Sequence, residues 1–239
     1  MLKVVLFDFN GVIINDEPIH RQLIDEILLA ENLRPASYQE HQEFCLGRSD
    51  RVCLRALLAH RGRPVSEEYL TKLIEKKAIA YRQKLAELDT LPIYDGLKRL
   101  LAQIQLKGWP LGLVTGAVKS ETILVLKKAE LFDYFQVIVA GDEINTSKPQ
   151  PDGYLLAIER FNQLNPELQL EPKHCLAIED SLAGLQAAKN AGIKVIGIAH
   201  TYPYHFMQRY GNWAVDKFSE IDLDRIEILY SRKTESILK

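Results

Sequence analysis

The chain lacks the features that mark membrane proteins and nucleic-acid-binding proteins. None of its apolar runs approaches the roughly 20 residues that a helix needs to cross a bilayer. Neither charge sign dominates, because 30 Lys and Arg residues stand against 32 Asp and Glu residues, and no basic stripe is present. We therefore expect neither nucleic acid nor a membrane among the partners of this protein.

Cysteine is scarce, and the three that occur are scattered. Cys45, Cys53 and Cys175 are odd in number and lack the spacing of metal ligands, so buried thiols are expected rather than a disulfide or a zinc site. The apolar run at the N-terminus is interrupted at Asp8, too early for a signal peptide or a membrane span. A cytoplasmic protein, either monomeric or weakly dimeric, is the expectation.

What the chain does have is a regular alternation of short apolar runs and helical patterns. Continuous apolar runs are typical of parallel strands covered on both faces. The predicted strands are 4–7, 111–114, 137–140, 175–178 and 195–199. The predicted helices between the later strands are 97–107, 120–129, 154–162 and 182–191. This order predicts an α/β fold with a doubly wound parallel sheet.

One segment, from about Glu17 to Leu88, interrupts the alternation with helical patterns only. Its predicted helices are 19–31, 51–61 and 67–86. Pro92 and Gly96 then punctuate the return to the sheet. We expect a core domain formed by residues 1–16 and 89–239, with a helical cap domain, residues 17–88, inserted after the first strand.

Polar residues follow the predicted strands in a set that suits phosphoryl transfer. They are Asp8, Thr115-Gly116, Lys148 and Glu179-Asp180. The carboxyl ends of parallel strands lie at one edge of a sheet, where ligands bind. There a carboxylate can attack phosphorus, a hydroxyl and an ammonium can hold the phosphoryl oxygens, and an acidic pair can bind magnesium.

These residues form four motifs in a recognisable order along nearly the whole chain. The motifs are Asp8-Phe9-Asn10-Gly11-Val12, Val114-Thr115-Gly116, Ser147-Lys148-Pro149 and Ile178-Glu179-Asp180-Ser181. On these motifs the chain resembles the haloacid dehalogenase superfamily, in the subgroup with a helical cap after the first motif. Together with Glu17-Pro18 and His20, they are similar to those of the phosphatases and β-phosphoglucomutases of this subgroup. That resemblance implies a Rossmann-like core, a small phosphorylated metabolite as substrate, and magnesium.

The resemblance also implies a role for each strand-end residue. Asp8 would be the nucleophile and a metal ligand, and the backbone carbonyl of Asn10 would bind the same metal. Asp180 would be a second carboxylate ligand, with Glu179 supporting the metal directly or through water. The phosphoryl group would be held by the side chains of Thr115 and Lys148 and by the backbone amide of Gly116.

Five further residues each allow two interpretations. Arg48 and Arg51 either contact a distal anionic group of the substrate or form surface salt bridges. Lys77 lies where related caps bring a lysine to the substrate, although a lysine on an exposed helix face needs no such role. His20 either contacts substrate or only covers the domain junction. Asp152 either caps the helix that follows it or supports Lys148.

The most informative absence is that of a second aspartate at position 10. In the family, an aspartate two residues after the nucleophile protonates the leaving oxygen and then activates the attacking water. Asn10 cannot exchange a proton in this way, which predicts a rate lower by roughly 10²–10⁴-fold. An engineered substitution and a deamidation at Asn10-Gly11 that restores aspartate are the alternatives to a natural variant.

The predicted function is a slow magnesium-dependent phosphatase that forms an aspartyl-phosphate on Asp8. Within enzymes, the alternative is a phosphomutase that returns the phosphoryl group to a sugar. In a different class, the alternative is a catalytically impaired protein that binds a phosphorylated ligand as a sensor. The motifs around Asp8, Lys148 and Asp180 are compatible with all three of these functions.

Overall fold

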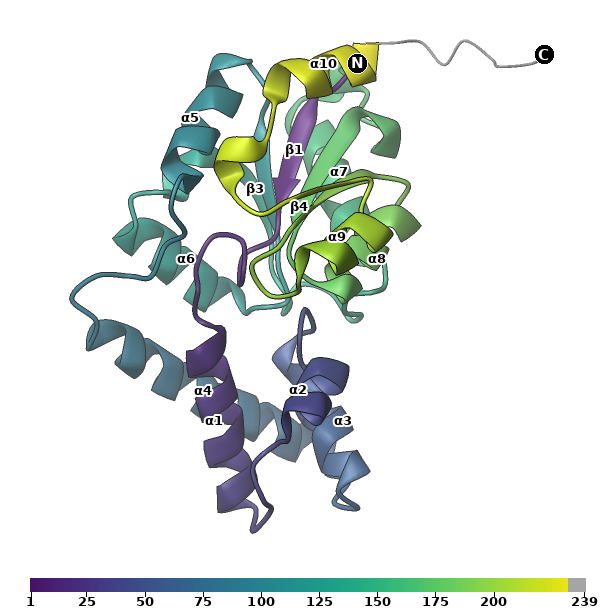
Figure 1. The fold of residues 1–239 in the computed structure, drawn as a ribbon. Coiled ribbons are helices and arrows are strands. Elements are labelled where there is room, and N and C mark those ends of the chain that lie inside the picture. Colours follow the sequence, from purple (N-terminus) through teal and green to yellow (C-terminus); the bar gives the residue numbers. More distant parts are fainter. Residues whose placement is uncertain (232–239) are drawn as a thin grey trace.

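A computed structural model describes residues 1–231, and its centre is a six-stranded sheet (Figure 1). The strands are β1 Val4–Phe7, β2 Leu111–Val114, β3 Phe135–Val139, β4 Cys175–Glu179, β5 Lys194–Ile198 and β6 Trp213–Val215. All neighbouring strands are parallel, in the order β3-β2-β1-β4-β5-β6. The predicted α/β fold is confirmed.

Helices cover both faces of this sheet. They are α5 Leu97–Leu106, α6 Lys119–Lys128, α7 Asp152–Leu164, α8 Leu182–Asn190, α9 Tyr204–Tyr210 and α10 Leu223–Ser231. Short 3-10 turns complete the connections: η1 Phe132–Tyr134, η2 Pro166–Leu168, η3 Pro172–His174 and η4 Phe218–Glu220. Helices α5, α6 and α10 pack in one apolar cluster, and α7, α8 and α9 pack in another.

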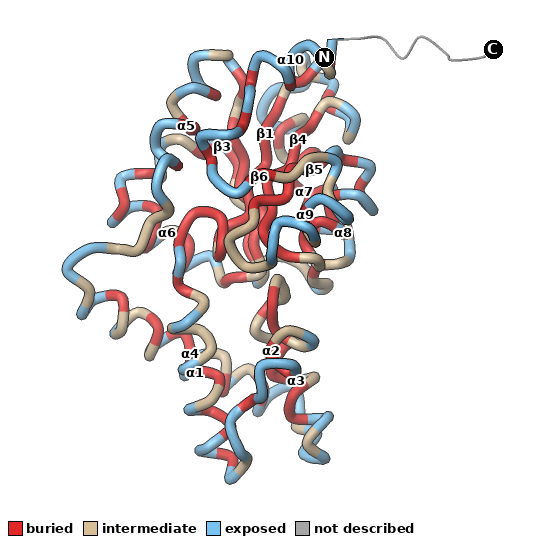
Figure 2. Tube along the Cα trace, in the orientation of Figure 1, coloured by how far each residue is buried: buried red, intermediate tan, exposed pale blue. Residues whose placement is uncertain are grey.

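Alternate residues of β1 serve these two clusters. Val5 and Phe7 face the α5, α6 and α10 side, whereas Val4 and Leu6 face the α7, α8 and α9 side. All four residues are fully buried, as Figure 2 shows by the red centre of the sheet. Burial on both faces is the reason that the strand is apolar throughout its length.

A separate group of helices lies beyond the carboxyl edge of the sheet (Figure 1). It consists of α1 Glu17–Ala30, α2 Tyr38–Phe44, α3 Asp50–His60 and α4 Glu67–Ala86. These helices have a buried apolar cluster of their own, which includes Leu28, Leu54 and Leu70. We refer to this group as the cap. The domain boundaries after residues 16 and 88 stay a prediction, and residues 232–239 of the predicted core lie outside the described residues.

Three helices and one strand were not predicted from the sequence: α2, α9, α10 and β6. Helix α2 has the polar sequence Tyr-Gln-Glu-His-Gln-Glu-Phe, which carries little apolar periodicity. Its start is nevertheless marked by a capping box, in which Ser37 and Glu40 satisfy each other's backbone N–H groups. Strand β6 is only three residues long and sits at the sheet edge, so it presents no apolar run.

The expectation about the cysteines is wrong for two of the three. Cys45, which ends α2, and Cys53, in the first turn of α3, form a disulfide across a Cα–Cα distance of 4.5 Å. The turn between the two helices brings the two residues together, and their spacing in the sequence carries no sign of it. Cys175 is a buried free thiol, as expected. Within residues 1–231, no helix has both the length and the apolar character needed to cross a membrane.

Candidate active site

The site begins where β1 ends. Asp8 directly follows the strand, and its backbone N–H donates to the carbonyl of Ile178 on β4 at 3.0 Å. Its side chain is buried at the carboxyl edge of the sheet. The chain then turns back at Gly11, whose φ of +80° suits glycine. A Cβ atom at Gly11 would lie 1.9 Å from Asp180 Oδ2, so this glycine lets the loop approach the second carboxylate.

Lys148 joins two of the predicted residues. Its Nζ donates to Asp8 Oδ1 at 2.6 Å and lies 2.6 Å from Glu179 Oε1. Burial alone would lower the pKa of this ammonium, but Asp8 and Glu179 together raise the pKa above its usual value. Lys148 is therefore charged at neutral pH, and Tyr154 supports the arrangement by donating to Glu179 Oε1 at 2.5 Å.

Asp180 completes an acidic group at the same edge. One oxygen each from Asp8, Glu179 and Asp180 lie within 4.8 Å of one another. Among the described residues, Glu179 Oε2 and Asp180 Oδ1 are buried without a hydrogen-bond partner. Burial, then repulsion from Asp8, raises the pKa of Glu179 to about 7 and that of Asp180 well above its usual value. Unpaired buried carboxylate oxygens that resist ionisation fit a divalent cation, which would supply the missing positive charge.

Thr115 and Gly116 lie beside this group, after β2. The Thr115 hydroxyl accepts the Ala117 N–H at 3.0 Å and is buried. Thr115, Gly116 and Lys148 line a small cavity of about 10 Å³, while Gly116 also borders the larger one that contains Asp8. The structure thus brings together the three residues to which the resemblance assigns phosphate binding.

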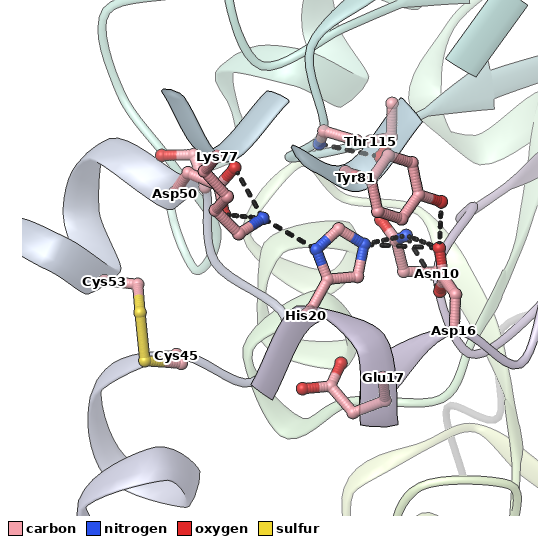
Figure 3. Close-up of polar contacts among 12 residues, drawn as sticks. Asn10, Asp16, Glu17, His20, Cys45, Asp50, Cys53, Lys77, Tyr81 and Thr115 are labelled. Atoms are coloured by element: carbon pink, nitrogen blue, oxygen red, sulfur yellow. Dashed lines mark hydrogen bonds and ion pairs between the residues drawn. A yellow bond between two sulfur atoms is a disulfide. The ribbon is translucent and has the colours of Figure 1, made fainter. Parts of the chain in front are cut away.

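The side chain of Asn10 is hydrogen-bonded to Asp16, a contact that the sequence did not reveal. Its Nδ2 donates to both carboxylate oxygens of Asp16, at 3.1 and 2.9 Å (Figure 3). Asp16 is fully buried and also accepts from the hydroxyl of Tyr81. Although burial alone would raise the pKa of Asp16, His20 and these hydrogen bonds lower it below the usual value. Asp16 is therefore an ionised carboxylate directly beside position 10.

His20 connects this pair to the cap. Its Nε2 lies 3.1 Å from Asn10 Nδ2 and 3.2 Å from Asp16 Oδ2, and its ring stacks on Tyr81 at 4.6 Å. On the other side, Lys77 Nζ lies 2.7 Å from His20 Nδ1 (Figure 3). Because an ammonium only donates hydrogen bonds, Nδ1 must be the acceptor in this contact. His20 therefore spans the junction and also lines the Asp8 cavity, and its contact with substrate stays a prediction.

Lys77 is not on an exposed helix face. The side chain is buried, and its ammonium pairs with Asp50 at 2.8 Å as well as with His20. The reason is that α4 packs against both α1 and α3, so that this face of the helix is covered. Lys77 supports two residues that line the Asp8 cavity, but it does not line that cavity itself.

The two arginines of the cap loop lie in different places. Arg48 lines the Asp8 cavity, which has room for about 50 Å³ of solvent, together with Asn10 and Asp180. Arg51 pairs with Glu67 at 2.9 Å and donates to Thr71 at 3.1 Å on the cap surface. Among residues 1–231, Arg48 has no carboxylate within salt-bridge distance. Of the two, Arg48 is the one placed to meet an anion.

Asp152 does not cap the helix that follows it, and its indirect support of Lys148 stays a prediction. Pro151 takes the N-cap position, and Asp152 is the first residue inside α7, where its charge favours the helix N-terminus. No hydrogen bond joins its side chain to Lys148 in the described chain. The sequence reading also missed Tyr154, Asp16 and Thr201, which donates to Asp180 Oδ2. Only their tertiary neighbours mark these three as part of the site.

Comparison with known proteins agrees with this geometry. The family model of haloacid dehalogenase-like hydrolases matches residues 2–192. Protein CbbY of Rhodobacter capsulatus is 31% identical over 82% of this chain and 84% of its own length. A phosphorylated carbohydrates phosphatase of Thermotoga maritima is 28% identical, with 84% and 87% covered. A phosphoglycolate phosphatase of Escherichia coli is also 28% identical, with 85% and 83% covered.

Solved structures show the same architecture. An aspartate-to-asparagine variant of CbbY from Rhodobacter sphaeroides, in complex with xylulose-(1,5)bisphosphate, superimposes with a TM-score of 0.78. It is 26% identical to this chain and covers 92% of it, with 96% of its own length matched. A β-phosphoglucomutase from Clostridium difficile, 22% identical, shares the fold with a TM-score of 0.83 over 96% and 97% of the two chains. The chain therefore belongs to the haloacid dehalogenase-like hydrolase family.

Proposed function

We propose that this protein is a magnesium-dependent phosphatase of a small phosphorylated metabolite, working through an aspartyl-phosphate on Asp8. The observation that carries the proposal is the contact of Asp8 with Lys148 beside the unpaired oxygens of Glu179 and Asp180. A nucleophile, a cation for phosphoryl charge and an oxygen-only metal site share one cavity edge. No simpler structural role explains buried carboxylates that lack partners.

The first chemical step belongs to Asp8. Its carboxylate oxygen forms a bond to phosphorus while the bond from phosphorus to the leaving oxygen breaks. Lys148 balances charge on the phosphoryl oxygens, and the hydroxyl of Thr115 and the amide of Gly116 orient them. Magnesium, held by Asp8, Asp180 and the Asn10 carbonyl with Glu179 in support, would neutralise further negative charge when bound.

Asn10 limits the rate in this proposal. The leaving oxygen receives no proton from residue 10, so substrates with stable leaving groups, such as aryl or acyl phosphates, react best in the first step. Water then attacks the aspartyl-phosphate without a base at position 10. Because the second step is slowed for every substrate, the phosphorylated form of Asp8 accumulates.

Arg48 points to the class of substrate. Its side chain borders the Asp8 cavity without a carboxylate partner in residues 1–231, and a guanidinium binds a carboxylate or phosphate in two parallel hydrogen bonds. Phosphoglycolate and sugar bisphosphates, which are named for the relatives, each carry a second anionic group. We propose that the substrate likewise carries a second anionic group, which Arg48 binds.

The test is phosphate release from a panel of phosphomonoesters, with magnesium and with a chelator. We expect slow release that requires magnesium and that favours substrates with two anionic groups. Acid quenching followed by peptide mass measurement should place the phosphate on Asp8. Isomerised product without phosphate release would favour the phosphomutase instead.

The pairing of Asn10 with Asp16 favours one second candidate, a protein that binds a phosphorylated ligand without turnover. In that case the same panel gives no phosphate release, while calorimetry detects magnesium-dependent binding. Phosphate bound covalently to Asp8 would exclude this candidate. The two proposals thus differ in one measurement on the same protein.

A further inference from the structure

The disulfide between Cys45 and Cys53 encloses the cap loop that faces the catalytic edge. Residues 46–52 lie between the two cysteines, and they include Arg48 and Asp50. Both cysteines border the same cavity as Asp8 and Arg48. Figure 3 shows the disulfide on the cap side, with His20 between it and Asn10. The bond therefore closes the loop at its base.

This loop contacts three of the core motifs. The Ser49 N–H donates to the hydroxyl of Ser147, the residue before Lys148, at 2.8 Å. Gly116 approaches so closely that a Cβ there would lie 3.0 Å from the Ser49 backbone nitrogen. A Cβ at Gly47, where φ is +72°, would lie 2.3 Å from the Ser181 hydroxyl oxygen. Any loosening of the loop thus disturbs the placement of Arg48 over the site.

We propose that opening and closing of the Cys45–Cys53 disulfide by a dithiol reductant regulates substrate binding at this site. The proposal rests on the proposed function for its kinetic consequence. In the oxidised protein the loop is preorganised and Arg48 faces the anion. In the reduced protein the loop samples more conformations, and the affinity for the substrate falls while the groups around Asp8 stay in place.

The redox step is an ordinary thiol–disulfide exchange. A thiolate of the reductant attacks the sulfur of Cys45, the S–S bond breaks, and the Cys53 sulfur leaves as a thiolate that takes up a proton. The second thiol of the reductant then displaces Cys45, which is also protonated. Two electrons and two protons pass to the protein, and the reductant becomes a cyclic disulfide. Both cysteines line the cavity, and we propose that a small dithiol reaches the disulfide from this side.

The first test does not depend on activity. Protein purified without reductant and denatured should show one reactive thiol, Cys175, and three after reduction. Limited trypsin digestion, with fragments reduced only afterwards, should cut after Arg48 or Arg51 about tenfold faster in the reduced protein. Cleavage after Lys173, in the core, is the internal control and should not change. Three reactive thiols in protein that has been exposed to oxidised glutathione would overturn the proposal, as would equal cutting in both states.

The second test uses the hydrolysed substrate. Reduction should raise KM about tenfold with kcat within about twofold, and reoxidation should reverse the change. The Cys45→Ser/Cys53→Ser variant should behave as the reduced protein and ignore the reductant, whereas Cys175→Ser should keep the full response. If the double variant does not fold, the reversible change in KM of the unsubstituted protein still tests the proposal. Unchanged KM after verified reduction would overturn the proposal, whereas a lack of any hydrolysed substrate would refute only the proposed function and leave the thiol and trypsin tests valid.

Discussion

Two polar clusters border the same cavity, and they are built differently. The strand-end cluster follows the sheet strands and consists of Asp8, Lys148, Glu179 and Asp180. It holds three carboxylates against one ammonium, and two carboxylate oxygens have no partner in the described chain. Such a cluster is incomplete without a cation.

The junction cluster connects the core to the cap and consists of Asn10, Asp16, His20, Lys77, Asp50 and Tyr81. Here the polar groups satisfy one another. Lys77 pairs with Asp50, and Asp16 is held by three neighbours, so no buried side-chain nitrogen or oxygen of the cluster lacks a partner among residues 1–231. The comparison teaches that unpaired buried charge is concentrated at the strand ends, whereas the junction cluster is paired internally and connects the cap to the core.

The largest expected effect is the loss of phosphate release when Asp8 of the strand-end cluster is replaced. Asp8→Asn should lower magnesium-dependent phosphate release on the order of 10⁴-fold or more, because an amide cannot form the phosphorylated intermediate. Steady-state phosphate assays and mass measurement of the Asp8 peptide check this. Asp152→Asn is the matched control and should retain activity. Equal activity of the Asp8 variant would remove the proposed mechanism.

The next effect concerns the junction cluster and takes two substitutions. Asn10→Asp alone would place a carboxylate about 3 Å from the ionised Asp16, and the repulsion would keep one of the two protonated. Asn10→Asp combined with Asp16→Ser should raise phosphate release roughly 10²–10⁴-fold. The single variant should gain less. Asp16→Ser alone controls for loss of the buried carboxylate. If Asn10→Asp alone is as fast as the double variant, repulsion from Asp16 does not hinder an acid at position 10.

Replacement of Lys148 tests how much the stability of the fold depends on the one ammonium group of the strand-end cluster. Lys148→Ala leaves buried carboxylates unpaired and should lower the free energy of unfolding by about 3 to 5 kcal/mol. Urea unfolding followed by circular dichroism measures this, with Lys173→Ala, an exposed lysine of the core, as the matched control. Magnesium should recover part of the loss, because it supplies positive charge at the same place. A stability equal to that of the control would mean that the cluster needs no cation.

The smallest expected effect lies beside the junction, at Glu121. This carboxyl on α6 is fully buried without a hydrogen-bond partner in residues 1–231, and burial raises its pKa from 4.5 to about 7. The folded state therefore binds more protons than the unfolded state between these values, and stability falls as pH rises from about 4.5 to 7. Glu121→Gln should remove this slope.

The measurement for Glu121 is urea unfolding at pH 5 and pH 8. Relative to the natural sequence, Glu121→Gln should gain about 2 to 3 kcal/mol between the two values. Glu75→Gln, on an exposed face of α4, should show no such gain. A parallel pH dependence of the Glu121 variant and the natural sequence would mean that Glu121 is ionised in the fold and balanced by Lys77.

Much of the fold could be predicted because it depends on local patterns. The strand 4–7, the helix 67–86 and the order of the four motifs follow from apolar runs, helical periodicity and short spacings. The same patterns located Asp8, Lys148 and Asp180, because residues that follow parallel strands must meet at one edge. Helix α2 was missed since its capping box stands before a polar sequence, and β6 because three residues at an edge carry no periodicity.

By itself, the sequence determined the parallel sheet, the helical segment after the first strand and the set of polar residues that meet at the strand ends. Only the tertiary structure decided that Asp16 binds Asn10, that Lys77 is buried against Asp50, and that Cys45 bonds to Cys53. The physical reason is that a strand or helix reports its own burial through its sequence period. A contact between two polar side chains depends instead on how the cap helices pack on each other and on the core, and no single segment encodes that packing.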